Sequence, residues 1–328
     1  MKKYMRIIIA LFLFFTVVGT SLWAGLPCTD PADCRGRLTF STGKKIPYYR
    51  NFPLNIRNVR ITRAIIVIHG TNRNADDYFK YVVNAAAAEG KLESTLILAP
   101  QFQAKADNPR QGEHLWEKDW RGGASSQGTP RFSSFSVIDE IYRKITATGY
   151  FKNLKVIILA GHSAGGQFVN RYAAGGRGPG TPGVRTLFLV MNPSSYLYID
   201  GRRYVRGGGF VVPKSAAPGY NTYKYGLISL NSYMQAQGIE TIVSNITGRR
   251  TYYLAGTRDT GEKNLDKRPQ AVFQGKTRYD RWKKYRSYTK LFPGWPENAV
   301  FLTVNGIGHS GEKMFNSYEA KKILFDLN

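Results

Sequence analysis

The chain has 328 residues, of which 42% are hydrophobic and 21% are charged, and its formal net charge is +25. This length and composition are ordinary for a globular protein with one sizeable core and argue against a chain too polar to fold. The positive charge predicts attraction to anionic surfaces, such as envelope lipids or acidic polymers, rather than specific binding of nucleic acid. A plain effect on solubility is the alternative.

Residues 1–24 have the features of a secretory signal peptide. Basic residues at positions 2, 3 and 6 precede an uncharged apolar run over 7–18, and a small-residue region ends near Ala24. The apolar run is too short to span a membrane comfortably. We therefore predict a signal peptide over 1–24 and a secreted or periplasmic protein, with a retained N-terminal anchor as the alternative.

The two cysteines of the chain, Cys28 and Cys34, lie just after this leader. In an exported protein their spacing predicts one local disulfide bond, with two free thiols as the alternative. The rest of the chain contains no internal repeat and no linker clean enough to divide it. We therefore predict a single α/β domain over 25–328.

Apolar strands alternate with amphipathic helices along this domain. Residues 38–41 and 46–49 predict an antiparallel hairpin that begins a mixed sheet. Further short buried strands are predicted at 64–68, 95–98, 156–159, 186–191, 251–255 and 299–304. Helices are predicted from Asn74 to Gly90, from Ser134 or Ser136 to about 145, after Ser163, over 227–237, over 269–292 and over 320–327. This alternation predicts a mostly parallel central sheet with helices on both faces.

Two long stretches lack a clear period. The polar loop over 101–130 contains Trp116 and Trp120, which either line an acyl or aromatic pocket or brace the loop. The segment that begins at Asn192 is rich in Gly, Pro, Tyr and Arg. It predicts a cap or loop insertion around 192–250. Its tyrosines, like the two tryptophans, either line a pocket or brace loops.

The stretch over 154–166 has the pattern of a nucleophile elbow. An apolar run ends at Gly161, and Ser163 follows within Gly-His-Ser-Ala-Gly. In such a strand-to-helix turn the serine hydroxyl is lifted clear of the sheet, and the two glycines have no side chains to collide with neighbouring backbone. Ser163 is therefore a candidate nucleophile, and a serine that merely begins a helix is the alternative.

A serine nucleophile requires a base, and the chain has four histidines. His69 ends a strand and would flank an oxyanion hole, His114 lies in the long polar loop, and His162 is predicted to face away from the serine. His309 stands in a Gly-rich loop after the last strand. His309 is the candidate base.

The base in turn requires an orienting carboxylate. Asp259 follows the strand over 251–255 in the turn Gly-Thr-Arg-Asp and is the predicted acid. Its rival is Asp200, which follows the strand after the elbow. No His, Cys or carboxylate cluster has the spacing of metal ligands, so we expect neither a metal nor a cofactor.

Four motifs together resemble those of the α/β-hydrolase superfamily: Gly-His-Ser-Ala-Gly-Gly, the upstream Ile-His-Gly-Thr, Gly-Thr-Arg-Asp and the late Gly-Ile-Gly-His. Their spacing is similar to that of its secreted serine esterases and lipases, least clearly over 192–250. The resemblance implies Ser163 as nucleophile, His309 as general base and Asp259 as acid. It also implies an oxyanion hole formed by the N–H groups of Thr71 and Ala164.

We therefore expect an exported serine hydrolase that cleaves a carboxylic ester of a small molecule, lipid or polymer through an acyl-enzyme. The alternative is a catalytically idle protein of the same fold that binds an anionic envelope component, and a peptidase is a third candidate. The segment over 276–290 interleaves basic and aromatic residues. It predicts an amphipathic helix with basic side chains in solvent, with contact to an anionic surface as the alternative.

Overall fold

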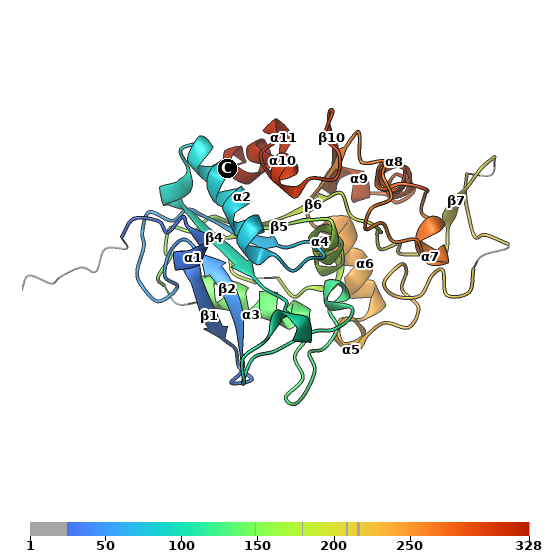
Figure 1. Ribbon diagram of the computed structural model, residues 1–328. Helices are drawn as coiled ribbons and strands as arrows, with labels where there is room; N and C mark the ends of the chain where they lie inside the picture. Colours follow the sequence, from blue (N-terminus) through green and yellow to red (C-terminus); the bar gives the residue numbers. More distant parts are fainter. Residues whose placement is uncertain (1–24, 148, 179, 208, 215–216, 328) are drawn as a thin grey trace, which may run out of the picture.

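The computed structural model describes residues 25–147, 149–178, 180–207, 209–214 and 217–327, so the predicted signal peptide lies outside the described residues. A mostly parallel, eight-stranded sheet runs through the centre of the molecule (Figure 1). In sheet order its strands are β1 (Arg35–Thr39), β2 (Lys45–Arg50), β4 (Thr95–Pro100), β3 (Arg63–Ile68), β5 (Val156–His162), β6 (Arg185–Met191), β9 (Thr251–Gly256) and β10 (Ala299–Val304).

The strand directions agree with the predicted mixed sheet. Strand β1 pairs antiparallel with β2, and β2 pairs antiparallel with β4, whereas the remaining neighbours are parallel. Every residue of β3, β4 and β5 is buried. Continuous burial is expected of central parallel strands that helices cover on both faces.

Helices pack on both faces of this sheet, and successive side chains of a strand supply two separate cores. In β3, Ala64 and Ile66 belong to one core, while Ile65 and Val67 belong to the other. The second core is covered by α1 (Pro31–Cys34), α2 (Ala75–Ala88), α10 (Gly311–Phe315) and α11 (Tyr318–Lys321). The first is covered by α3 (Ser134–Thr146), α4 (Ala164–Gly175), α5 (Ser232–Gln235), α6 (Ile239–Gly248), α8 (Arg278–Thr289) and α9 (Trp295–Asn298).

Several predicted helix limits were wrong. The helix expected over 269–292 is divided into α7 (Pro269–Val272) and α8, because Gly275 between them has a φ of 145°, which a helix cannot contain. Helix α3 begins at Ser134, one of the two predicted starts, and its cap is Ser133, whose hydroxyl accepts a hydrogen bond from the N–H of Phe135. The helix predicted over 320–327 is divided into the end of α11 and a π-helical turn, Lys322–Asp326.

The segment between β6 and β9 contains little regular structure. Strands β7 (Arg203–Val205) and β8 (Gly209–Val211) form a small hairpin, which lies at the right of Figure 1, away from the central sheet. The helix predicted over 227–237 is reduced to α5, and α6 was not predicted. Ile242 and Ile246 lie one turn apart and bury the inner face of α6. A capping role for 192–250 stays a prediction.

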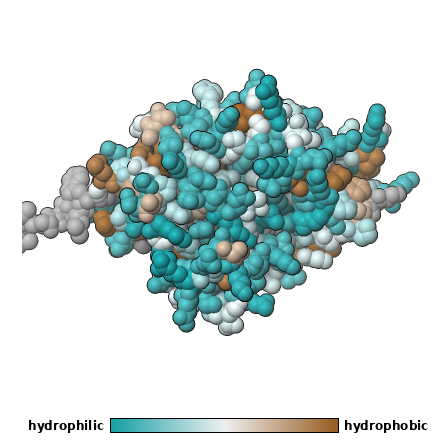
Figure 2. All heavy atoms as spheres, in the orientation of Figure 1, coloured by the Kyte–Doolittle hydropathy of each residue, from teal (hydrophilic) through white to brown (hydrophobic). Residues whose placement is uncertain are grey.

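Two further features concern the surface. The face of the molecule seen in Figure 2 is covered mainly by hydrophilic side chains. Cys28 and Cys34 form the predicted disulfide bond. Across the described part of the chain, none of the helices combines the length and the apolar character that crossing a membrane requires.

Helix α4 approaches the sheet so closely that Gly165, in its first turn, has no room for a side chain. A Cβ atom at Gly165 would lie 2.1 Å from the carbonyl oxygen of Ile68, and one at Gly161 would lie 2.4 Å from the main chain of Gly165. Both distances are far below van der Waals contact. The helix that follows Ser163 can therefore pack against the end of β3 only because these positions have no side chain.

The substitution Gly165→Ala should lower the free energy of unfolding by about 3 kcal/mol or more, because the added methyl group collides with backbone that cannot move aside. Urea denaturation followed by circular dichroism measures the change. The matched control is Gly248→Ala at the end of α6, where a Cβ would meet nothing within 4 Å. If both variants unfold at the same urea concentration, the close-packing argument is wrong.

Candidate active site

Ser163 occupies a strained turn between β5 and α4. Its φ of 57° and ψ of −117° lie outside the regions that a residue with a side chain usually adopts. Its N–H donates to the carbonyl of Met191 at the end of β6, at 2.9 Å. Because Ala164 begins α4, the positive end of the helix dipole lies beside the serine. The hydroxyl therefore stands at the carboxyl edge of the sheet.

The two predicted partners of Ser163 follow other strands that end at the same edge. Asp259 lies in a turn after β9, where its N–H donates to the carbonyl of Gly256 at 3.0 Å. His309 lies in the loop after β10. Since β5, β6, β9 and β10 are parallel neighbours, their carboxyl ends meet at one side of the sheet. Residues 146 positions apart in the chain, Ser163 and His309, are thereby brought into contact.

The three side chains form one hydrogen-bonded line. Ser163 Oγ lies 2.9 Å from His309 Nε2, and His309 Nδ1 lies 2.7 Å from Asp259 Oδ2. Because a carboxylate only accepts, Nδ1 of His309 carries the proton and Nε2 is free to accept one from the serine. The Asp259 side chain is 1% exposed and that of His309 is 24% exposed. The imidazole can therefore take the hydroxyl proton while the carboxylate steadies the resulting charge.

The rival acid, Asp200, is engaged elsewhere. It forms an ion pair with Arg202 at 2.6 Å and accepts a hydrogen bond from the hydroxyl of Tyr288 at 2.8 Å. Between the two carboxylates, only Asp259 contacts His309. The geometry therefore favours Asp259 over Asp200 as the orienting acid.

Arg278 is a member of the site that the sequence pattern did not single out. Its guanidinium lies 3.4 Å from Asp259 Oδ1, and both side chains are 1% exposed. It also donates to Ser194 Oγ at 3.1 Å and to the carbonyl of Lys263 at 2.8 Å. Burial lowers the pKa of Arg278, and the charge of Asp259 opposes that shift. Arg278 therefore holds Oδ1 of Asp259, while Oδ2 contacts His309.

Asn192 is a second member that sequence reasoning missed. It follows β6 with a φ of 45°, its amide oxygen accepts from the N–H of Gly256 at 2.9 Å, and its amide nitrogen donates to the carbonyl of Gly308 at 3.3 Å. One side chain thus ties the loop of Asp259 to the loop of His309. A polar residue directly after a buried strand was the available signal, although it was interpreted only as the start of an insertion.

The ring of His162 packs against that of His309. Its ring centroid lies 4.6 Å from that of His309, and its Nδ1 lies 3.1 Å from the hydroxyl of Tyr78. Complete burial, and then the nearby His309 and Arg278, hold the pKa of His162 well below its usual value. His162 is therefore neutral near pH 7 and supports His309 without adding a competing charge.

His69 and His114 form hydrogen bonds that hold loops in place. The N–H of Phe102 donates to His69 Nε2 at 2.9 Å, so the proton sits on Nδ1, which donates to the carbonyl of Gly70 at 2.8 Å. Burial lowers the pKa of His69 to about 3. His114 contacts the hydroxyls of Thr42 and Ser126 at 2.8 and 2.9 Å and fastens the long polar loop. Burial lowers its pKa to about 4.

The predicted aromatic residues of the long loop act as braces. Trp116 and Trp120 are 0% and 3% exposed, and the Trp116 indole donates to the carbonyls of Ala124 and Phe132. Tyr196 is likewise buried, and its ring stacks on Tyr285 at 4.2 Å. These side chains therefore belong to the core and not to the wall of the pocket at Ser163.

A pocket of about 220 Å³ opens at Ser163 and His309. Gly70, Thr71 and Asn72 form one wall, and Lys263 and Asn264 line it as well. Thr71, predicted as an oxyanion donor, therefore lies at the pocket. Ala164 is the first residue of α4, so its N–H has no acceptor within the helix. Among the described residues, no group of three or more His, Cys, Asp or Glu side chains is arranged to hold a metal ion.

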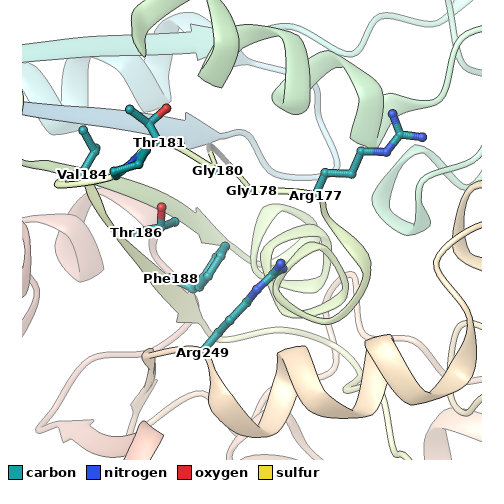
Figure 3. Close-up of a pocket in the computed structure, with 9 residues that line it drawn as sticks. Arg177, Gly178, Gly180, Thr181, Val184, Thr186, Phe188 and Arg249 are labelled. Atoms are coloured by element: carbon teal, nitrogen blue, oxygen red, sulfur yellow. The ribbon is translucent and has the colours of Figure 1, made fainter. Parts of the chain in front are cut away.

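A larger pocket, of about 440 Å³, lies far from this edge. Figure 3 shows Thr186 and Phe188 projecting from β6 and Arg249 from the segment after α6. Thr186 pairs with Ile157 near the start of β5, whereas Ser163 follows the end of that strand. The length of β5 therefore separates this pocket from the serine.

No protein-family model and no curated protein sequence matches the chain. Two solved structures are similar to it over most of their length. The LpqC poly(3-hydroxybutyrate) depolymerase from Bordetella parapertussis has a TM-score of 0.62 and 21% identity, covering 89% of this chain and 90% of that one. Poly(aspartic acid) hydrolase-1 from Sphingomonas sp. KT-1 has a TM-score of 0.61 and 21% identity, covering 89% and 98%.

The substitution Arg278→Met should lower the free energy of unfolding by about 3 kcal/mol or more, because breaking a buried ion pair leaves the carboxylate of Asp259 without a charged partner. Urea denaturation measures this loss. Arg258→Met, at an exposed position beside Asp259, is the matched control and should change the free energy by less than about 0.5 kcal/mol. Equal effects of the two substitutions would contradict the role given to Arg278.

The free energy of unfolding should decrease as the pH falls below about 6.5, because His114 takes up a proton in the unfolded chain before it does so in the folded one. Its folded pKa of about 4 gives a slope of up to about 1.4 kcal/mol per pH unit from this one residue. His114→Gln, which can still bond the hydroxyls, should make the pH profile shallower by that amount. Parallel profiles for the two proteins would refute this assignment.

Proposed function

We propose that this chain, which has the α/β-hydrolase fold, is a serine hydrolase that cleaves carboxylic esters. The observation that carries the proposal is the hydrogen-bonded line from Ser163 through His309 to Asp259, which opens into a pocket. The strained backbone of Ser163 adds support, because such a turn raises the hydroxyl above the sheet.

The reaction proceeds in two steps. His309 Nε2 removes the hydroxyl proton as Ser163 Oγ attacks the carbonyl carbon of the ester, and Asp259 stabilises the imidazolium that forms. The tetrahedral intermediate expels the alcohol, which takes the proton from His309, and Ser163 is left acylated. Water then attacks the acyl-enzyme through the same base, which releases the carboxylic acid and restores the serine.

The N–H groups of Thr71 and Ala164 are the proposed donors to the oxyanion. Ala164 lies at the N-terminus of α4, where both the free N–H and the helix dipole favour a negative charge. Thr71 lines the pocket at Ser163. Each donor is expected to stabilise the transition state by about 3 kcal/mol, as oxyanion-hole donors do in other enzymes.

Polymers are candidate substrates because the two similar structures are of proteins named for polymer hydrolysis. One is described as a depolymerase of poly(3-hydroxybutyrate), a polyester, and the other as a hydrolase of poly(aspartic acid), whose units are joined by amides. Ester cleavage is the primary proposal, and amide cleavage is the second candidate because the same three groups can perform it. A panel of esters and matched amides, scored by kcat/KM, distinguishes them.

Secretion or export to the periplasm is part of the proposal. The disulfide bond between Cys28 and Cys34 supports an oxidising compartment, in line with the leader predicted over 1–24. Contact with an anionic surface has less support than the sequence suggested. Arg278 and Arg281, counted among the solvent-facing basic residues of α8, are 2% and 0% exposed, so fewer charges of this helix face outward.

The decisive test is the substitution Ser163→Ala. It should reduce kcat for an activated ester by about 10⁴-fold or more, because the acyl-enzyme can no longer form. A fluorophosphonate probe should label the unmodified protein and fail to label the variant. Ser244→Ala, at an exposed position on α6, is the matched control and should retain labelling. If well-folded protein is not labelled, the chain is the catalytically idle alternative.

A further inference from the structure

A second cavity, of about 400 Å³, lies beside the pocket of Ser163. Its walls include Gly122 of the long loop, Tyr223 and Lys224 of the segment after β8, and Arg268 and Gln270 after β9. No role in the reaction has been given to any of these residues. The cavity is therefore a candidate site for a separate ligand or for a part of the substrate that lies away from the reacting ester.

One loop after β9 contributes residues to both cavities. Asn264 lines the pocket of Ser163, and Arg268, four residues later, lines the second cavity. Four residues span at most about 14 Å even when fully extended. An extended chain bound with its ester carbonyl at Ser163 can therefore reach the second cavity along one loop.

Helix α4 gives an independent measure of this separation. Gln167 and Arg171 follow Ser163 at intervals of four residues and therefore lie on the same face of the helix. Arg171 Nε donates to the carbonyl of Lys224 at 3.0 Å. Eight residues of helix correspond to about 12 Å along its axis. The main chain of Lys224 is thus held by an arginine that lies about two turns along α4 from Ser163.

Positive charge at this cavity is only partly compensated. The Lys224 side chain is 6% exposed, and its ammonium group has one carboxylate contact, with Asp119 Oδ1 at 3.4 Å, while the Asp119 side chain is 60% exposed. Arg171 is completely buried, and within the described part of the chain it donates to the carbonyls of Lys224 and Gln167 and to the hydroxyl of Ser195, with no carboxylate partner. Arg268 is paired with Asp266.

The pKa of Lys224 reflects this excess of positive charge. Burial, followed by the charges of Arg121, Arg171 and Arg268, lowers the pKa to about 7, and Asp119 opposes the shift. A bound anion would relieve this repulsion, because it places a negative charge beside a desolvated ammonium group.

We propose that the second cavity binds a free carboxylate of the substrate, so that the protein prefers esters whose acyl chain ends in an acid group on the order of 12 Å from the scissile carbonyl. The inference rests on the proposed function. Lys224 supplies the principal donor, and Arg268 lies at the mouth of the cavity with a side chain that is 53% exposed. The substrate class is thus an acidic oligoester or a half-ester of a long dicarboxylic acid.

The test compares 4-nitrophenyl esters in pairs. The decanedioic acid monoester carries a carboxylate that can reach Lys224, the succinic acid monoester carries one that cannot, and the decanoate ester carries none. The ratio of kcat/KM for the decanedioic over the decanoate ester should fall about 10- to 100-fold in Lys224→Met, because a charge-assisted hydrogen bond is lost. Arg268→Gln should lower the ratio less, and Lys152→Met, at an exposed position before β5, should not change it.

The succinic monoester provides the length control. Its ratio to a neutral ester of the same length should not respond to Lys224→Met. Equal responses for the short and the long acid would show a general electrostatic effect of the basic protein and would overturn the proposal. An unchanged decanedioic ratio in Lys224→Met would overturn it as well.

Binding without turnover separates this proposal from the proposed function. Decanedioate should bind the Ser163→Ala protein in calorimetry, and the added substitution Lys224→Met should weaken that binding at least about 10-fold. Binding should also weaken as the pH rises from 6 to 9, because Lys224, which faces Arg121, Arg171, Arg268 and Asp119, loses its proton in this range. If no ester is cleaved but decanedioate still binds in this way, the proposed function fails and the carboxylate site stands.

Discussion

The contact between the first turn of α4 and the ends of β3 and β6 governs the rest of the site. A Cβ at Gly165 or Gly166 would come within 2.1 Å of the carbonyl of Ile68 or 2.6 Å of that of Met191, so the helix lies directly on the strand ends. This packing leaves Ser163 a single position, in a backbone conformation that an isolated chain would avoid. The hydroxyl of Ser163 is therefore fixed relative to the sheet. The strands of the same sheet also position Asp259 and His309.

Buried arginines donate hydrogen bonds to the main-chain carbonyls of the irregular segments, as neighbouring strands do within the sheet. Arg171, Arg203, Arg278 and Arg281 are among the largest fully buried side chains, and each donates to main-chain carbonyls of loops. Carbonyls in an irregular buried segment have no ladder partner and would otherwise be left unsatisfied. Because a guanidinium carries five donors in a rigid fork, one arginine can fasten several of them.

This use of arginine links the architecture to the chemistry. Arg278 fastens the carbonyl of Lys263 and at the same time contacts Asp259, so one side chain holds both the loop along the pocket of Ser163 and the carboxylate of Asp259. Arg171 similarly holds the carbonyl of Lys224 and contributes positive charge to the second cavity. Part of the strong positive charge of the chain is thus internal, where it supports loops and creates a field for an anion.

The sequence by itself determined the alternation of strands and helices, the mostly parallel sheet, and Ser163, Asp259 and His309 as candidates, because each is a local signal. Buried apolar runs mark strands, and residues that follow such runs collect at one edge of a parallel sheet. Only the tertiary structure shows that Asp259, and not Asp200, contacts His309, and that the rings of His162 and His309 lie together. The break that separates α7 from α8 and the burial of the basic residues Arg278 and Arg281 were likewise visible only in the tertiary structure. Each depends on which loops meet above the sheet, and loops held by side-chain contacts over long sequence distances carry no periodic pattern from which their partners could be predicted.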